Sequence, residues 1–189
     1  MKQSVERCKV TCSVGFLLLT AGLIYLDGVN LFAQVMISCL VHEVGHYAAA
    51  RGVGSRVCFL RLTAVGAEME LDPSVHLSYL SDALLVFAGP MANLAAAWVA
   101  VKLGLNFFAG LNLCFGILNL LPVCPLDGGR LLIDILSLLN PVLAERVHAV
   151  ISVLFCGALL GLGWTAWRRW GNLSLLFVAL WLIAGRAKE

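Results

Sequence analysis

The residues His42-Glu43-Val44-Gly45-His46 lie inside a long apolar stretch of the chain. On a helix, positions i and i+4 lie on one face about one turn apart, so the two imidazoles can bind one zinc ion. Glu43 follows the first histidine directly, and its carboxylate can act as general base on a water whose pKa zinc lowers toward about 7. The spacing therefore predicts a hydrolytic zinc site with His42 and His46 as ligands.

The alternative is that two histidines and a glutamate simply pack one helix face, because a pattern of five residues is short. An ionisable side chain within an apolar membrane span costs about 2.5 kcal/mol or more, and such side chains are by default functional. The apolar setting of His42 and His46 therefore favours the metal site.

A catalytic zinc usually has three protein ligands and one open position, so another segment must supply the third ligand. The run NLLPVCPLDGGR covers residues 119–130. Its prolines cannot continue a helix and its Gly-Gly pair permits a sharp turn, so we expect unwound backbone around Asp127. Unwound backbone at membrane depth is buried in protein or lines a wet cavity. Asp127 is the predicted third ligand, and Asn119 could bind a substrate backbone or free helix carbonyls; the alternative is an ordinary loop with a solvated aspartate.

The run FAGPMANLAAA, residues 87–97, combines a proline, several small residues and one amide within an apolar segment. One interpretation is a kinked helix whose small residues allow close packing against its neighbours. The functional interpretation makes Asn93 a hydrogen-bonding partner that supports the site from a neighbouring helix, or a contact for substrate.

The composition predicts an integral membrane protein. Hydrophobic residues make up 61% of the 189 residues and charged residues 13%, with a mean hydropathy of +0.93. Soluble domains have roughly 25% charged residues. The 13 Lys and Arg against 11 Asp and Glu also argue against a nucleic-acid binder or a disordered chain. The seven cysteines are scattered without a CxxC pair, so we interpret them as apolar filler.

We expect an all-α polytopic membrane protein, with residues 1–189 forming one transmembrane domain whose core is 30–140. A short membrane-associated β-hairpin is predicted over 56–72, where apolar and polar residues alternate on both sides of Gly66. A two-stranded hairpin is marginal alone, so we expect it to lie against the membrane face or the helices. The predicted helices cover residues 10–26, 31–50, 80–101, 107–121, 147–167 and 173–184.

The basic residues predict the orientation in the cell membrane. With a cytoplasmic N-terminus, ten Lys and Arg lie at inner ends of spans and three at outer ends. Arg51 follows His46 by five residues, so the site is expected toward the cytoplasmic side. The pair Arg168 and Arg169 opposes this rule, and the last two segments could instead be re-entrant or interfacial.

The runs HEVGH, FAGPMAN and NLLPVCPLDGGR resemble, in order and spacing, the site-2 protease family of intramembrane zinc metalloproteases, peptidase family M50. The resemblance covers roughly residues 10–140. It implies zinc held by His42, His46 and Asp127, with Glu43 as catalytic base and Asn119 supporting substrate or site. The short hairpin, with no PDZ insertion, is similar to the sporulation branch of the family, whose members cleave the membrane-associated pro-sequence of a sigma factor.

Two features depart from that family pattern. The hairpin region of the family usually has Gly-Gly after Pro-Phe, whereas this chain has Ala64-Val65-Gly66, which leaves Gly66 as the candidate for contact with substrate. Sporulation-type members often carry a C-terminal CBS domain that senses nucleotide. The chain continues for only three residues after Arg186, so we expect no nucleotide control by such a domain.

The predicted function is an intramembrane zinc metalloendopeptidase acting on membrane-embedded or membrane-associated proteins, for example a pro-sigma or anti-sigma factor, and open to control by membrane-bound regulators. A zincin with a downstream glutamate as third ligand is disfavoured, because no later apolar span contains a glutamate. A metal transporter is disfavoured, because it should spread polar ligands over several spans, whereas here they converge on two segments. A catalytically inactive zinc-binding homologue that acts as chaperone or adaptor remains the main alternative, although such a protein should have lost Glu43.

Overall fold

A computed structural model of the chain describes residues 9–63, 66–72, 75 and 77–186. The chain forms two compact units, one of Met1–Leu77 with Ala88–Gly116, and the other of Ser78–Phe87 with Ile117–Glu189. The helices α2 (Tyr79–Lys102) and α3 (Asn106–Asn119) each contribute residues to both units.

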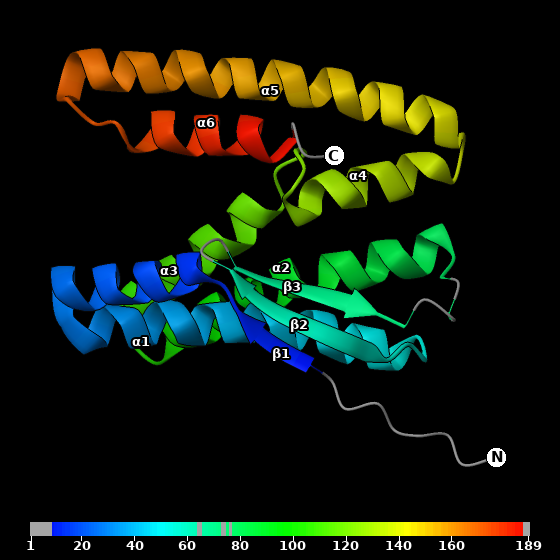
Figure 1. Ribbon diagram of the computed structural model, residues 1–189, viewed down its shortest axis with the longest axis horizontal. Coiled ribbons are helices and arrows are strands. Elements are labelled where there is room, and N and C mark those ends of the chain that lie inside the picture. The colour runs from blue at the N-terminus through cyan, green and yellow to red at the C-terminus, as the bar shows by residue number, and fades with distance from the viewer. Residues whose placement is uncertain (1–8, 64–65, 73–74, 76, 187–189) are drawn as a thin grey trace. The chain divides into compact units, whose positions relative to one another are not determined.

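The first unit contains a three-stranded sheet in the order β1-β2-β3 (Figure 1). Its strands are β1 (Lys9–Cys12), β2 (Val57–Thr63) and β3 (Gly66–Leu71), and β2 pairs parallel with β1 and antiparallel with β3. The prediction that a helix begins at residue 10 is therefore wrong, because Lys9–Cys12 form a strand and the helix begins at Val14. Val10 and Thr11 are β-branched and suit a strand, and the third strand adds pairing that a lone hairpin lacks.

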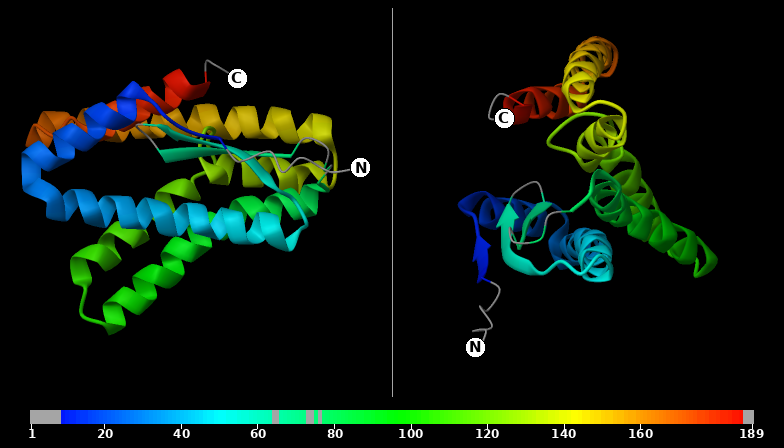
Figure 2. Two further views of the ribbon diagram at one scale, coloured as in Figure 1. Left: turned by 60° about the horizontal axis from the view of Figure 1, so that its bottom comes forward. Right: turned by 90° about the vertical axis from the view of Figure 1, so that its right-hand side faces the viewer.

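The histidine motif lies on α1 (Val14–Gly52), which covers both of the first two predicted segments from Val14 onward. Ser13 begins the helix, because its side chain accepts a hydrogen bond from the Phe16 backbone N–H at 3.2 Å. The helical chain reverses its direction about midway, which gives α1 two arms (Figure 2). The HEVGH run belongs to the arm that leads toward β2.

Small residues bring the helices of the first unit close together. A Cβ atom added at Gly45 of α1 would lie 2.6 Å from the carbonyl oxygen of Ala88 in α2. One added at Gly116 of α3 would lie 2.9 Å from the Leu94 side chain of α2. Both distances are too short for a real side chain, so glycine at these positions is what permits the close packing. Helix packing through small residues is typical of membrane proteins.

The second unit contains α4 (Asp127–Ser137), α5 (Pro141–Trp170) and α6 (Ser174–Arg186). Asn140 begins α5 by accepting hydrogen bonds from two backbone N–H groups, and Gly171 ends it with a φ of 67°. The segment before α4 packs against α5 and α6 through a small core. The buried members of this core are Val123, Cys156 and Leu182, with Leu126, Phe155, Leu159 and Trp181 partly buried around them.

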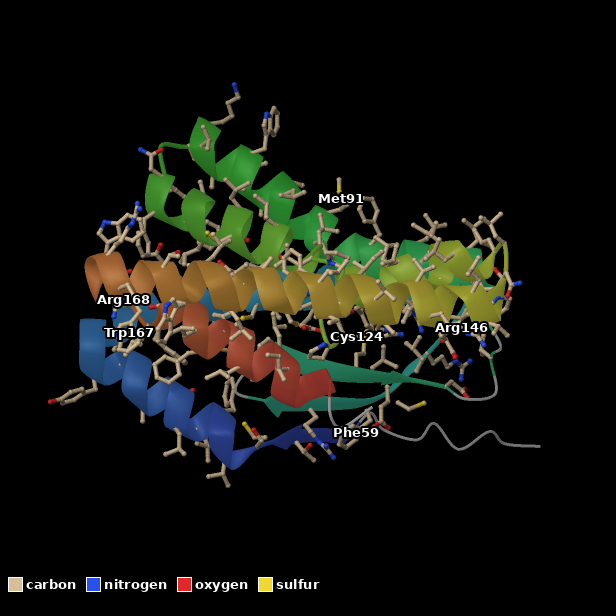
Figure 3. The ribbon with its side chains drawn as sticks, turned by 90° about the horizontal axis from the view of Figure 1, so that it is seen from above. Phe59, Met91, Cys124, Arg146, Trp167 and Arg168 are labelled. Carbon is tan, nitrogen blue, oxygen red and sulfur yellow. The ribbon has the colours of Figure 1, made fainter. Side chains whose placement is uncertain are left out.

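Within the described residues, the two helices that are long and apolar enough to cross a membrane are α2 and α5. Shorter apolar helices cover Asn106–Asn119 and Ser174–Ile183. Trp167 and Arg168 lie near the C-terminal end of α5, and Arg146 lies near its other end (Figure 3). Basic and aromatic side chains at the ends of an apolar helix are typical of a span whose ends reach the membrane interface.

Candidate metal centre

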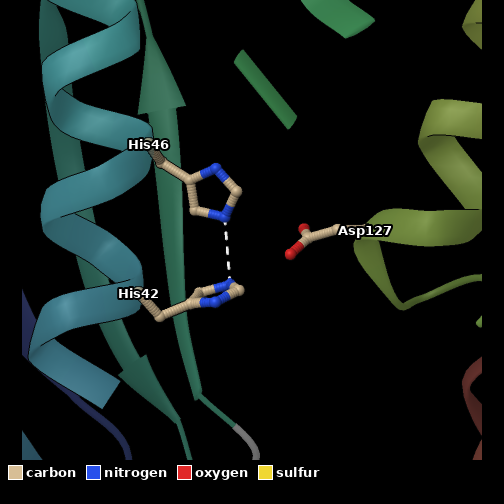
Figure 4. A group of neighbouring side chains, drawn as sticks. All are labelled: His42, His46 and Asp127. Atoms are coloured by element: carbon tan, nitrogen blue, oxygen red, sulfur yellow. Dashed lines mark hydrogen bonds between the residues drawn. The ribbon is translucent and has the colours of Figure 1, made fainter. Parts of the chain in front are cut away.

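His42 and His46 lie side by side on one face of α1, as their spacing predicts (Figure 4). Their Nε2 atoms are 3.0 Å apart, and the ring planes are nearly perpendicular at 85°. Both side chains are buried, with 7% and 9% of their surface exposed. Two ring nitrogens therefore converge in a buried place, which is the arrangement that two histidine ligands of one metal ion require.

The other ring nitrogen of His42 is held by α2. Its Nδ1 atom lies 2.7 Å from Oδ1 of Asn93, and Asn93 is fully buried. Metal-binding histidines usually donate their second N–H to an oxygen of this kind, which sets the tautomer and the ring orientation. Asn93 thus contacts the first histidine directly and does not lie on an outer face of the helix.

Two further buried residues, Asn112 of α3 and Ser38 of α1, surround Asn93, and the sequence analysis did not select them. A signal for each was present in the chain. Ser38 precedes His42 by four residues and so lies on the same helix face. Asn112 is an amide within an apolar helix, where a polar group is by itself a sign of function.

The second histidine is confined by the backbone of α2. A Cβ atom added at Gly89 would overlap the ring of His46. The glycine in the FAGP run therefore makes room for the imidazole, in addition to any role in helix packing.

Glu43 is the residue of α1 between the two ligand positions, and its side chain is half-buried. Consecutive residues on a helix do not share a face, so Glu43 lies beside the line through the two histidines and not on it.

Asp127 lies in the second unit, where it is the first residue of α4 (Figure 4). The prediction of unwound backbone around Asp127 is therefore wrong in its extent: the irregular stretch comes before Asp127. Gly128 and Gly129 belong to the first helical turn and make no sharp turn. Cβ atoms added there would overlap the backbone of Leu120 and of Cys124 respectively, so the two glycines let the helix start against the segment that precedes it.

Asn119 is the last residue of α3 and is half-buried. Gly66 begins β3 and pairs with Thr63, whereas Ala64 and Val65 lie outside the described residues. The first unit thus brings together His42, His46 and Asn93. Asn119 and Asp127 are placed in the second unit.

An acidic pair lies farther along the second unit. Arg130 is 3.6 Å from a carboxylate oxygen of Asp82, and the buried Asp134 contacts the same aspartate. Burial and the neighbouring Asp82 raise the pKa of Asp134 to about 6, while Arg130 acts in the opposite direction. Asp134 therefore holds its proton to a higher pH than an ordinary aspartate does.

The residue types fit zinc. His42, His46 and Asp127 each offer one ligand atom. Two neutral imidazoles with one carboxylate are a known ligand set of hydrolytic zinc sites. The convergence of the two Nε2 atoms, and the support of the first histidine by Asn93, are the observations on which this fit rests.

Comparisons with known proteins find a family match and several relatives. Residues 101–162, which include Asn119 and Asp127, match the family described as peptidase family M50. Stage IV sporulation protein FB of Bacillus subtilis is 30% identical over 152 residues, which cover 75% of this chain and 53% of that protein. A zinc metalloprotease of Methanocaldococcus jannaschii is 28% identical over 119 residues, which cover 57% of this chain and 34% of that protein. The chain thus spans about half the length of the first relative and about a third of the second.

A solved structure is similar over the whole chain. The site-2 protease from Methanocaldococcus jannaschii matches with a TM-score of 0.71, 22% sequence identity, and coverage of 100% of this chain and 93% of that one. At this identity the likeness concerns the fold.

Proposed function

We propose that the chain is a zinc-dependent endopeptidase of membrane-embedded or membrane-associated proteins and belongs to peptidase family M50, the site-2 protease family. The observation that carries the proposal is the buried pair of Nε2 atoms, 3.0 Å apart on an apolar helix and supported by Asn93. A buried polar centre in such surroundings is costly unless it serves a function.

In this proposal zinc is held by His42, His46 and Asp127. When bound, zinc polarises the scissile carbonyl and lowers the pKa of a water molecule toward about 7. His42 binds through Nε2, because its Nδ1 is already engaged by Asn93. Asp127 supplies the carboxylate that completes a set of three protein ligands.

Glu43 is the proposed general base and general acid. Its carboxylate takes a proton from the attacking water while the water oxygen forms a bond to the scissile carbonyl carbon. The protonated Glu43 then delivers this proton to the leaving amine nitrogen as the C–N bond breaks. Asn119, at the end of α3, is the proposed donor to the substrate backbone.

The substrate must present an extended stretch, because a helix hides its carbonyl groups in its own hydrogen bonds. Among the described strands β3 pairs with β2 alone, so its outer edge can take an added strand. Strand addition uses backbone hydrogen bonds and tolerates many side chains. Gly66 begins this edge strand, and we propose that it contacts substrate there.

We further propose that the chain is a multi-pass protein of the cell membrane, with its site toward the cytoplasmic side. The length of α2 and α5 supports spans, and α5 exposes large apolar side chains along its length. The similarity to a sporulation protein makes a pro-sigma or anti-sigma factor the first substrate class to test, with membrane-bound regulators as further partners.

The test is cleavage of tagged single-span and membrane-associated proteins, including a pro-sigma factor from the same genome, in co-expressing cells. Glu43→Gln should reduce cleavage by roughly 100-fold or more, because general acid-base catalysis contributes about that much. Zinc content of the purified protein should stay at one ion per chain. Glu145→Gln, at an exposed position of α5, is the matched control and should cleave as the original chain does.

Persistent cleavage by the Glu43→Gln protein would refute the role of Glu43. A folded, zinc-loaded chain that cleaves none of these proteins would instead favour an inactive homologue that acts as chaperone or adaptor.

A further inference from the structure

The hydrogen bonds around Asn93 have a fixed direction. Its side-chain Nδ2 lies 2.9 Å from the backbone oxygen of Ser38 and 2.8 Å from Oδ1 of Asn112. A backbone carbonyl can only accept, so the amide NH2 must be the donor at this position. The Asn93 oxygen is therefore the atom that faces His42, and it can only accept. His42 must donate to it through Nδ1–H.

Two more backbone carbonyls extend this constraint to Asn112 and Ser38. Nδ2 of Asn112 donates to the Phe108 carbonyl and to Oγ of Ser38, each at 3.0 Å. The Ser38 hydroxyl then donates its own proton to the Gln34 carbonyl at 2.9 Å. Rotation of either amide by half a turn would place two donors or two acceptors against each other, which a fully buried network does not tolerate.

We propose that Asn112 and Ser38 are positioning residues that act through Asn93 to hold His42 in its Nδ1-protonated tautomer, with the Nε2 lone pair directed at the metal. The inference rests on the proposed zinc binding for its purpose, although the tautomer itself follows from the hydrogen bonds alone. Neither residue needs to contact zinc or substrate.

The first experiment is nitrogen NMR of the whole chain with labelled histidine, purified in detergent and stripped of metal with a chelator. The chain has four histidines, so the His42 and His46 signals are identified from His42→Gln and His46→Gln proteins. We expect the proton on Nδ1 of His42. A proton on Nε2 of His42 would overturn the inference, and this measurement needs neither zinc nor activity.

The second experiment compares Asn112→Leu with Asn112→Asp by competition of the protein against a zinc chelator. Asn112→Leu removes the acceptor that orients the Asn93 amide, so zinc affinity should fall roughly 10-fold and both His42 tautomers should appear. Asn112→Asp keeps an oxygen facing Asn93, so its affinity and tautomer should stay closer to those of the original chain. A purely structural role predicts the reverse order, because a buried carboxylate is harder to accommodate than leucine.

A matched serine pair separates the network from burial in general. Ser38 and Ser55 are both buried in the first unit, but Ser55 is not part of the network. Ser38→Ala should lower zinc affinity by about 3-fold to 10-fold and Ser55→Ala should leave it unchanged. Equal effects would overturn the proposal. If the original chain binds no zinc but shows the stated tautomer of His42, the proposed function fails and the inference about His42 stands.

Discussion

The first unit positions its two histidines differently from the way the second unit positions Asp127. His42 donates one hydrogen bond to the side-chain oxygen of Asn93, and the Asn93 amide is oriented in turn by the backbone carbonyl group of Ser38. Asp127 depends on backbone packing, because Gly128 and Gly129 let the start of α4 lie against the preceding segment. An imidazole can rotate and exchange tautomers, so it needs polar partners. Either of the two equivalent oxygens of a carboxylate can bind a metal, so fixing the backbone position of Asp127 largely fixes its ligand atom.

This difference predicts that the two units respond differently to the same small change, the addition of one methyl group at a glycine. At Gly128 in the second unit, the added methyl group would overlap backbone atoms, which cannot shift without disturbing the fold. At Gly89 in the first unit, it would overlap the His46 side chain, which can change its orientation. The former should cost stability, and the latter should cost metal binding.

Gly128→Ala should have the largest effect on stability. Its Cβ would overlap the carbonyl groups of Leu120 and Leu121, and overpacking of this kind typically costs about 1–3 kcal/mol or more. Thermal unfolding of the detergent-solubilised protein, followed by loss of helical circular dichroism, measures this. Gly110→Ala in α3 is the control, because nothing lies within 4 Å of its added Cβ, and it should be neutral or stabilising by up to about 1 kcal/mol. Equal melting temperatures for the two variants would contradict packing as the means of placing Asp127.

Gly89→Ala should leave most of the stability intact and weaken zinc binding. The added Cβ would displace the His46 ring, and loss of correct ligand orientation typically costs roughly 10-fold to 100-fold in metal affinity. Chelator competition measures the affinity, and melting in the presence of chelator measures the fold without metal. A variant with normal zinc affinity and a strongly lowered melting temperature would show that Gly89 serves helix packing and not the histidine.

Ser152→Ala should have a smaller effect, confined to stability. The buried Ser152 hydroxyl lies 3.0 Å from Nε2 of His148 and 3.5 Å from the carbonyl oxygen of Pro122, so it connects α5 to the segment before Asp127. Loss of one buried hydrogen bond costs about 1 kcal/mol. Thermal unfolding should show this loss while zinc affinity changes less than 3-fold, in contrast to the Asn112→Leu protein. A larger loss of zinc affinity would mean that the second unit also positions its ligand by hydrogen bonds.

Asp134→Asn should show an effect only as a dependence on pH. The pKa of Asp134 is raised to about 6 from 3.8, so the folded state binds the proton more tightly than the unfolded state does. The resulting stabilisation is complete below about pH 4 and is lost as the pH rises through about 6. Asparagine has no proton to lose, so the variant should gain stability relative to the original chain between pH 4 and pH 7.

Melting temperatures measured across that range test this prediction. Asp82→Asn in a chain that keeps Asp134 should shift the loss of stability to lower pH, because Asp82 is one of the causes of the raised pKa of Asp134. A difference between Asp134→Asn and the original chain that does not change with pH would contradict it.

The sequence alone was enough to predict the two histidines as a pair, because the helical period that places residues i and i+4 together is a local property. Composition also predicted apolar helices, and among the described residues α2 and α5 are long and apolar enough to cross a membrane. The same local logic located the HEVGH, FAGPMAN and NLLPVCPLDGGR runs. Its errors were local too: the Gly-Gly pair after Asp127 suggested a turn, whereas it belongs to the first turn of α4.

Only the tertiary structure showed which distant groups meet. β1 pairs in parallel with β2, although all of α1 separates the two strands in the sequence. Nothing in either strand's own residues predicts this pairing. The connection from Ser38 through Asn112 and Asn93 to His42 crosses three helices. Hydrogen bonds between helices depend on which faces pack together and at what distance, and glycines such as Gly45 and Gly116 set that distance. The candidate ligands could therefore be predicted from the chain, whereas the residues that contact His42 followed only from how the helices pack.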